Sequence, residues 1–405
     1  MSTIFEEQIS RKPDHYPWAN QFIESMHNGF WTDKEFNFQS DIQDFKVHLN
    51  DTEKEMVVRC LSAIGQIEVA VKTFWAKLGQ NLPHPSLTDL GYVMANVEVI
   101  HNNAYERLIK LLEMEDVFEK NLELDIIRNR VKYLRKYNHK YYKDSKKQYV
   151  YSLILFTLYV ENVSLFSQFY TINYFNRFRN VLKDTAQQVA YTSKEELIHS
   201  MVGIKLINTI RGEMPELFDE EFCELIRTQC VKAYEAESAI IEWSVNGYQS
   251  EHLTSAIMKN FIKNRLNDSL KEIGIEPVFT DVDSELLEKT TWFDEDVLGN
   301  TATDFFFKRP TEYSKNDKSY DEDDLFYKDN YIMNAHIKAI LTKLEGMRDI
   351  AKADLEVYLR APAGIGEHPG IGHEIEILIG QIDSLDSKIE TIKRYYSTPR
   401  TAGNN

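Results

Sequence analysis

The sequence predicts an all-α protein, and three observations carry that prediction. From Glu53 to about Lys263, proline and glycine are scarce outside a few breaks. Apolar residues in this stretch recur at steps of three and four, the spacing of a helix with one buried face. We find no convincing alternation of apolar and polar residues that would indicate strands, and no internal repeat. Long helices packed around a common core are therefore expected.

Composition places the chain among globular proteins and narrows its partners. With 405 residues, 43% hydrophobic and 12% aromatic, it can bury a large core. The net charge of −17 leaves no concentrated basic surface for phosphate groups, which argues against a general nucleic-acid binder. The three cysteines (Cys60, Cys223 and Cys230) lack Cys-x-x-Cys spacing, so neither a disulfide framework nor a thiolate metal site is predicted. A reducing cytoplasm fits this usage.

No segment predicts export or membrane insertion. Residues 1–17 carry acidic side chains and no apolar stretch, unlike a signal peptide. The most apolar run, Tyr149 to Val160, is too short to span a bilayer and ends at Glu161. This pattern is typical of a buried core helix that keeps a polar residue, and a cytoplasmic protein is expected.

The chain is expected to comprise three parts. Residues 1–300 should form one helical domain, because its breaks punctuate the helices without dividing them. Residues 301–330 are polar and include the acidic run 321–324, which predicts a mobile tail. In residues 331–405, apolar residues return at heptad-like steps on both sides of a turn-rich connector at 362–372. This last part predicts a coiled-coil-like helical hairpin.

Two Glu-x-x-His pairs stand in the predicted helices: Glu98 with His101, and Glu196 with His199. Positions i and i+3 lie on one helix face, so a carboxylate and an imidazole at that spacing can reach one metal ion together. With eleven histidines in the chain, one such match is expected by chance. A third pair, Glu24 with His27, is discounted because no suitable carboxylate-bearing helix precedes it.

Each of the two retained pairs is preceded by an apolar helix with one isolated carboxylate, Glu68 and Glu161 respectively. An ionised carboxylate in a dry core is costly unless it is paired or metal-bound. Any one of these side chains alone would more often be satisfied by a hydrogen bond in the core. Together, the order Glu, Glu-x-x-His, Glu, Glu-x-x-His on four successive helices matches the known pattern of ferritin-like dimetal carboxylate proteins.

The expected protein is therefore a ferritin-like helical bundle with a dinuclear metal site. Carboxylate-rich ligation without cysteine suits iron or manganese better than zinc or copper. Tyr105 follows His101 by four residues and is expected on the same helix face, where a phenol can donate an electron and a proton. The alternative for Tyr105 is an ordinary core tyrosine. The expected metal ligands are Glu68, Glu98, His101, Glu161, Glu196 and His199.

Over residues 15–326 the sequence resembles the small subunit of class I ribonucleotide reductases. The order and spacing of the motifs are specific. In chain order, the motifs are Asn28–Trp31, Glu98–Tyr105, Lys194–His199, Arg309–Ser314 and Asp321–Phe326.

The resemblance implies a protein that assembles a high-valent dimetal or tyrosyl-radical oxidant for deoxyribonucleotide synthesis. The oxidant passes to a large subunit, where nucleotides are reduced. Tyr105 occupies the position of the family's radical tyrosine. Trp31 and Glu195 resemble the tryptophan and the carboxylate at which the radical starts its path out of the subunit. Tyr313 resembles the tyrosine in the tail that relays the radical further along this path. The acidic stretch ending at Phe326 resembles the peptide that docks on the large subunit, and a homodimer is expected.

Two departures from the family pattern bear on mechanism. Glu68 stands where many members have aspartate, and Lys72 follows one turn later. This resembles the branch with a dimanganese centre, so two manganese ions are preferred over two iron ions, and the role of Tyr105 stays open. Lys72 is either part of that site or an ordinary lysine extending to solvent. The hairpin of 331–405 is the second departure, and it is either an accessory module or a site of oligomerisation or partner recruitment.

A different ferritin-like oxidase or monooxygenase, acting directly on a small substrate, is the main alternative. Such an enzyme would need a substrate pocket but neither Tyr313 nor the acidic tail. A binding or scaffold protein built around the terminal hairpin is a more distant alternative, and metal content near zero would favour it.

Overall fold

The structure, a computed structural model, describes residues 3–299 and 371–396 and several positions between 341 and 359. The described residues form helices and loops and contain no strand, which confirms the all-α prediction. The chain divides into two compact units, Met1–Ser314 and Lys315–Asn405. The predicted tail of residues 301–330 lies outside the described residues.

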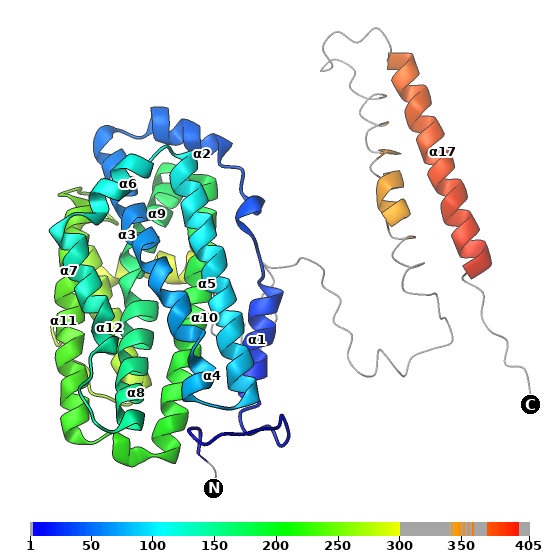
Figure 1. Cartoon of the computed structure of the whole chain (residues 1–405). Coiled ribbons are helices and arrows are strands. Elements are labelled where there is room, and N and C mark those ends of the chain that lie inside the picture. The colour runs from blue at the N-terminus through cyan, green and yellow to red at the C-terminus, as the bar shows by residue number, and fades with distance from the viewer. Residues whose placement is uncertain are drawn as a thin grey trace, which may run out of the picture. The chain divides into compact units, whose positions relative to one another are not determined.

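Long helices build the first unit (Figure 1). The longest are α3 (Asp51–Trp75), α5 (Pro85–Leu111), α10 (Lys183–Glu213), α11 (Glu220–Val245) and α12 (Ser255–Glu272). The shorter α-helices are α1 (Trp18–Asn28), α2 (Gln39–Gln43), α4 (Leu78–Asn81), α6 (Glu115–Leu122), α7 (Asp125–Leu134), α8 (Ser145–Ile154), α9 (Phe166–Arg179) and α13 (Ser284–Glu288). Turns of 3₁₀-helix are η1 (Asp33–Glu35), η3 (Arg135–Asn138) and η5 (Pro215–Leu217), and π-helical segments are η2 (Asp44–His48), η4 (Leu155–Ser164) and η6 (Phe293–Leu298).

Several helices begin where a short polar side chain caps them. Asn50 and Glu53 each accept a hydrogen bond from the other's backbone N–H, which forms a capping box at the start of α3. Asp219 and Thr254 cap α11 and α12 through their side-chain oxygens. Helix α5 begins at Pro85, whose missing N–H would have no partner in the first turn. Local sequence thus sets where these helices start.

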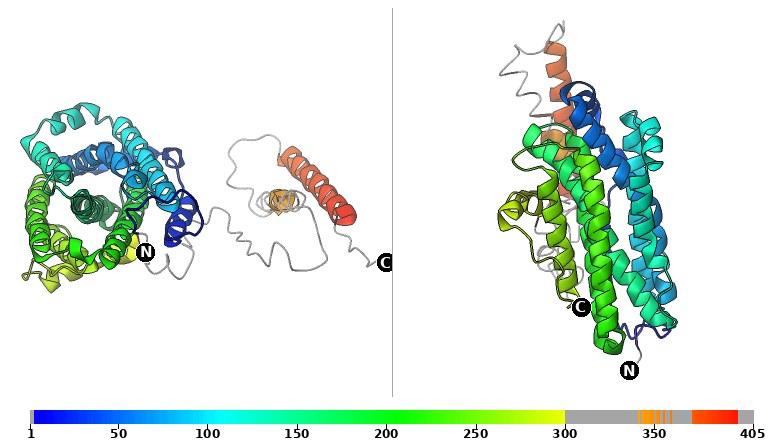
Figure 2. Two further views of the ribbon diagram at one scale, coloured as in Figure 1. Left: turned by 60° about the horizontal axis from the view of Figure 1, so that its bottom comes forward. Right: turned by 90° about the vertical axis from the view of Figure 1, so that its left-hand side faces the viewer.

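The middle of the first unit is one continuous helical stretch, α8–η4–α9, which packs against α3, α10, α11 and α12. Viewed from below, the other helices surround it (Figure 2). The stretch Ser145–Arg179 is long and apolar enough to cross a membrane by length and composition, but 89% of its apolar window is buried inside the protein. It is therefore longer than the apolar run in the sequence indicates, and it is a core helix, as predicted.

Two glycines allow neighbouring helices to approach closely. A β-carbon added to Gly91 on α5 would lie 2.6 Å from the backbone oxygen of Trp75, at the end of α3. A β-carbon added to Gly203 on α10 would overlap with the side chain of Thr157 on η4. Both contacts hold together helices that carry predicted metal ligands.

In the second unit, the described residues are helix α17 (Ile371–Tyr396) and helical positions between 341 and 359, and the connector expected at 362–372 lies mostly outside them. Leu385 and Ile389 of α17 are buried, as is Ala351. Arg348 pairs with Asp386 of α17, with 3.4 Å between Nη1 and Oδ1. The described buried positions thus lie where the two helical segments contact each other.

Candidate metal centre

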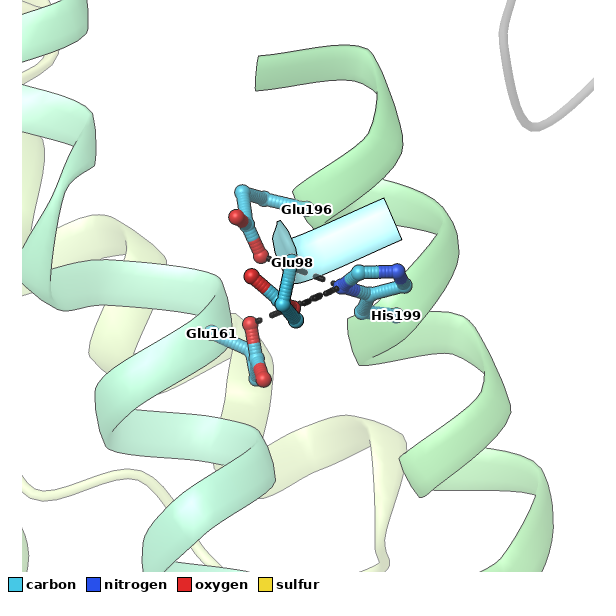
Figure 3. Close-up of side chains that lie close together, drawn as sticks. All are labelled: Glu98, Glu161, Glu196 and His199. Atoms are coloured by element: carbon cyan, nitrogen blue, oxygen red, sulfur yellow. Dashed lines mark hydrogen bonds and ion pairs between the residues drawn. The ribbon is translucent and has the colours of Figure 1, made fainter. Parts of the chain in front are cut away.

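Three helices of the first unit direct carboxylate and imidazole side chains to one buried place. Helix α5 provides Glu98 and His101, η4 provides Glu161, and α10 provides Glu196 and His199. One potential ligand atom from each of Glu98, Glu161, Glu196 and His199 lies within 4.8 Å of the others. Figure 3 shows the three carboxyl groups of this cluster on one side of His199, facing Nδ1 of its ring.

The distances within the cluster are those of ligands that share a cation. Nδ1 of His199 lies 2.8 Å from Oε1 of Glu98, 3.3 Å from Oε2 of Glu196 and 3.9 Å from Oε2 of Glu161. Two ligands at right angles on a cation, each about 2.1 Å away, would lie about 3 Å apart. The cluster therefore has the spacing that metal coordination requires.

His101 faces the same carboxylates from the other Glu-x-x-His pair. Its Nδ1 lies 3.1 Å from Oε1 of Glu196 and 3.4 Å from Oε2 of Glu98. The centroids of the two imidazole rings are 6.3 Å apart. Glu98 and Glu196 thus each have one oxygen near His101 and the other near His199, an arrangement that suits two cations.

The donor set fits a pair of hard divalent cations. Glu98, Glu161, Glu196, His101 and His199 are all buried. Within the described part of the chain, both oxygens of Glu98 and Oε1 of Glu196 accept no hydrogen bond of good geometry. Buried anionic oxygens in such numbers are costly without a compensating charge, and bound cations would supply it.

The pKa values of the cluster residues also favour a site for cations. Burial, together with the negative charges of Glu196 and Glu98, raises the pKa of Glu161 well above its usual range. Burial would lower the pKa of His199, but the surrounding carboxylates outweigh it and raise that pKa. Burial would likewise raise the pKa of Glu196, but its contacts with Glu161, His101 and His199 lower it. Without metal, Glu161 and His199 therefore bind protons more tightly than in water, and bound cations would compete with these protons.

A hydrogen-bonded chain leads away from His101. Its Nε2 lies 2.7 Å from Oε2 of Glu195, and the same oxygen accepts a hydrogen bond from the indole Nε1 of Trp31 at 2.8 Å. The Trp31 and His101 rings are nearly parallel, with 6.2 Å between their centroids. Trp31 lies in the segment between α1 and η1 and is buried. The two residues that the resemblance pairs with each other therefore meet on the side of His101 turned away from the cluster.

Trp75, which the sequence analysis did not single out, also contacts the cluster. Its indole Nε1 donates a hydrogen bond to Oε1 of Glu161 at 2.6 Å. Its ring lies beside His199, with 6.2 Å between centroids. Trp75 follows Glu68 by seven residues on α3, so the two share a helix face, and that spacing could have identified it.

The remaining predicted residues of the helical domain have these positions. Glu68 lies on α3, and its side chain is outside the described part of the structure. Lys72, one turn later, has a half-buried side chain. Tyr105 is buried on α5 and lines a cavity of about 420 Å³. Glu24 and His27 are exposed on α1. Tyr313 and the acidic stretch ending at Phe326 lie outside the described residues.

The fold and the site together define a ferritin-like helical protein with a buried dinuclear metal centre. The family model described as "Ribonucleotide reductase, small chain" matches residues 8–285. The chain belongs to this family: it is the small subunit of a class I ribonucleotide reductase, and so part of an oxidoreductase. Such subunits work with a large subunit and are usually dimers.

Known relatives resemble the chain over most of their length. The subunit beta of the ribonucleoside-diphosphate reductase of Halalkalibacterium halodurans is 21% identical over 76% of this chain and 89% of the relative. The corresponding subunit of Treponema pallidum is 22% identical over 76% of this chain and 88% of the relative.

Solved structures show the same fold. The R2 subunit of Clostridium botulinum ribonucleotide reductase superposes with a TM-score of 0.63 at 19% identity, over 69% of this chain and 87% of that one. Dimanganese(II)-NrdF of Streptococcus sanguinis superposes with a TM-score of 0.60 at 16% identity, over 71% of this chain and its whole length.

Proposed function

We propose that this small subunit holds two manganese ions and passes an oxidising equivalent to the large subunit through Trp31. The observation that carries the proposal is the chain of contacts from Trp31 through Glu195 to His101, which ends at carboxylates facing both histidines. An enzyme that acts on a substrate at its own metal centre has no need for such a connection. The proposed ligands are Glu68, Glu98, His101, Glu161, Glu196 and His199.

The choice of manganese over iron rests on two points. Glu68 stands where many family members have aspartate, and one protein with the same fold is a dimanganese(II) protein. Bound manganese or iron ions would supply one-electron redox chemistry that carboxylates and imidazoles lack. Lys72, one turn after Glu68 on α3, is proposed to contribute to the charge balance of the site.

Trp31 and Glu195 are suited to move an electron and a proton together. When an indole loses an electron, its N–H becomes acidic, and the indole nitrogen of Trp31 lies 2.8 Å from a carboxylate oxygen of Glu195. Glu195 can take this proton and return it when the indole is reduced. The same oxygen fixes the orientation of the His101 ring, so one side chain positions both neighbours.

Burial protects this chemistry. Trp31 and Trp75 cover the histidine sides of the cluster, and both side chains are almost completely buried. Excluding water prevents a strong oxidant from being quenched before transfer. Tyr105, also buried and one turn after His101, is proposed as a second redox-active side chain, because its phenol can lose an electron and a proton.

For the residues after the helical domain, the proposed roles rest on the resemblance to the family. Tyr313 relays the oxidising equivalent, and the acidic stretch ending at Phe326 docks on the large subunit. The subunit is proposed to act in the cytoplasm as a homodimer. Residues 1–300 form the metal domain, 301–330 the docking tail and 331–405 an appended hairpin.

Removing the residues after Arg309 tests the proposal against a self-contained oxidase. The truncated protein should keep its metal ions and lose nucleotide reduction with the large subunit. Retained reduction by the truncated protein would contradict the proposal. His101→Ala is the companion variant, and it should lose both metal and activity; full metal loading and full activity would show that the ligand assignment is wrong.

A further inference from the structure

Glu161 lies on an unusual helical segment. Segment η4, Leu155–Ser164, is π-helical, and π-helices are rare and mostly short because their hydrogen bonding is less favourable. At the start of α9, the N–H of Gln168 donates to the Leu165 carbonyl, three residues earlier. An α-helix would instead direct that N–H to Ser164. The Ser164 carbonyl therefore needs another donor.

Arg130 on α7 supplies that donor. Its Nη2 donates to the backbone oxygen of Ser164 and, at 3.1 Å, to Oε1 of Gln168. Its Nη1 donates to the backbone oxygen of Ala63 on α3 at 3.0 Å. Nε and Nη2 also form a two-pronged ion pair with Glu237 on α11, at 2.9 and 3.1 Å. Arg130 and Glu237 are both fully buried.

A second arginine holds the same segment from another side. Arg265 on α12 donates through Nε to the backbone oxygen of Asn162 at 2.9 Å and through Nη2 to Oδ1 of the same residue at 2.8 Å. Its guanidinium group stacks on the Phe166 ring, 3.6 Å from the centroid. Asn162 and Ser164 lie one and three residues after Glu161, so the two arginines hold the part of η4 next to this carboxylate.

Stability alone does not account for the buried ion pair. Removing two charges from water is costly, and apolar residues of similar size often stabilise a core equally well or better. Arg130 and Glu237 do provide five directed hydrogen bonds that end on four helical segments. Apolar packing cannot supply that directional control.

We infer that the ion pair of Arg130 with Glu237, together with Arg265, is a positioning device that fixes the π-helical segment and thereby the carboxylate of Glu161 in the metal site. The inference rests on the proposed function, in which Glu161 is a ligand. Arg130 and Arg265 are positioning residues, since they act through the backbone and side chain of η4. Outer contacts of this kind, when lost, typically weaken metal binding about ten- to hundredfold.

Three variants of the full chain separate positioning from stability. Arg130→Met removes the donor to Ser164 and leaves Glu237 without its partner, so both stability and Mn(II) affinity should fall. The double variant Arg130→Met with Glu237→Met replaces the ion pair by apolar side chains of similar volume, so thermal stability should recover part of the loss, because no unpaired charge stays buried. Mn(II) affinity should stay about tenfold or more below that of the wild type, because the Ser164 carbonyl still lacks its donor.

Arg179→Met is the matched control. Arg179 on α9 pairs with the buried Glu53 at the start of α3, so its loss also removes an ion pair between helices. It lies at the far end of α9 from η4. This variant should lose thermal stability and keep the Mn(II) affinity of the wild type.

The measurements are Mn(II) affinity by competition with a chelator, the electron paramagnetic resonance spectrum of the Mn(II)-loaded protein, and melting temperature. A double variant with the wild-type affinity and spectrum would overturn the inference. So would affinities that follow melting temperature across all variants, including Arg179→Met. A wild-type protein that binds no Mn(II) would contradict the proposed function itself, and the positioning role would fall with it.

Discussion

Trp75, the last residue of α3, donates its indole N–H to Oε1 of Glu161 on η4 across 2.6 Å. Both side chains are almost completely buried, so this bond forms away from water. A hydrogen bond to a carboxylate is stronger there than at the surface. Trp75 therefore directs one oxygen of Glu161 and leaves the other free to face His199.

Replacing Trp75 by phenylalanine should weaken metal binding. The ring would still fill most of the space, but Oε1 of Glu161 would lose its donor in a buried setting, which costs about 1–3 kcal/mol. We expect weaker Mn(II) retention and an altered resonance spectrum of the loaded protein. Chelator competition and electron paramagnetic resonance would measure both.

Trp292→Phe is the matched control for this variant. Trp292 is also a buried tryptophan, and its Nε1 donates a hydrogen bond to the Tyr170 hydroxyl at 2.9 Å. Its loss removes one buried indole hydrogen bond that does not involve the cluster. Equal losses of metal affinity in the two variants would contradict a specific role for Trp75.

Glu195→Gln should separate metal binding from radical transfer. Glutamine keeps the shape and can still accept the Trp31 N–H, but an amide cannot take up the indole proton. We expect near-normal metal content and a fall of about hundredfold or more in nucleotide reduction with the large subunit. Glu106→Gln, an exposed change on α5, should leave both unchanged. Full activity of Glu195→Gln would show that Trp31 transfers no proton to this carboxylate.

Mn(II) affinity should rise with pH. The pKa values of Glu161 and His199 are both raised, so each group binds a proton more tightly in the metal-free protein than it would in water. A cation must displace these protons, and each proton displaced changes the affinity by about tenfold per pH unit. Acid should therefore weaken loading and alkali strengthen it, until both groups have lost their protons. Calorimetric titrations in buffers of different ionisation enthalpy would count the protons released; a count of zero would mean that neither Glu161 nor His199 is protonated before the metal binds.

Sequence periodicity predicted the ligand helices because the relevant geometry is local. Glu98 with His101 and Glu196 with His199 share a face in any α-helix, so their spacing alone placed both pairs. The isolation of Glu161 in an apolar run made it a candidate ligand, but that pattern did not predict the π-helix on which it lies. That segment depends on Arg130 and Arg265, which lie 34 and 103 residues from their backbone partners along the chain. Short-range pattern analysis does not detect such contacts.

The close approach of α10 to η4 is equally absent from local patterns. Gly203 looks unremarkable within α10, where glycine is merely a weak helix former. A glycine is needed at this position because the side chain of Thr157 occupies the space that a β-carbon would fill. Thr157 lies 46 positions earlier in the sequence. Gly203 follows His199 by one turn, and Thr157 precedes Glu161 by one turn. Their contact therefore sets the separation of the proposed ligands on the two helices.

Gly203→Ala should consequently damage the metal site through packing. The added methyl group would overlap with Thr157, and relieving that overlap moves α10 and η4 apart. Overpacking of this kind costs about 1–3 kcal/mol. Because the displacement separates Glu196 and His199 from Glu161, Mn(II) affinity should fall together with melting temperature.

Gly212→Ala on the same helix isolates the effect of the close contact. A β-carbon at Gly212 meets no described atom within 4 Å, so alanine there changes only helix propensity and should raise stability by up to about 1 kcal/mol. Chelator competition and thermal unfolding of the two variants, side by side, would measure the difference. If Gly203→Ala bound Mn(II) as tightly as Gly212→Ala, the distance between α10 and η4 would not control ligand geometry, since the same chemical change would have no effect at the contact.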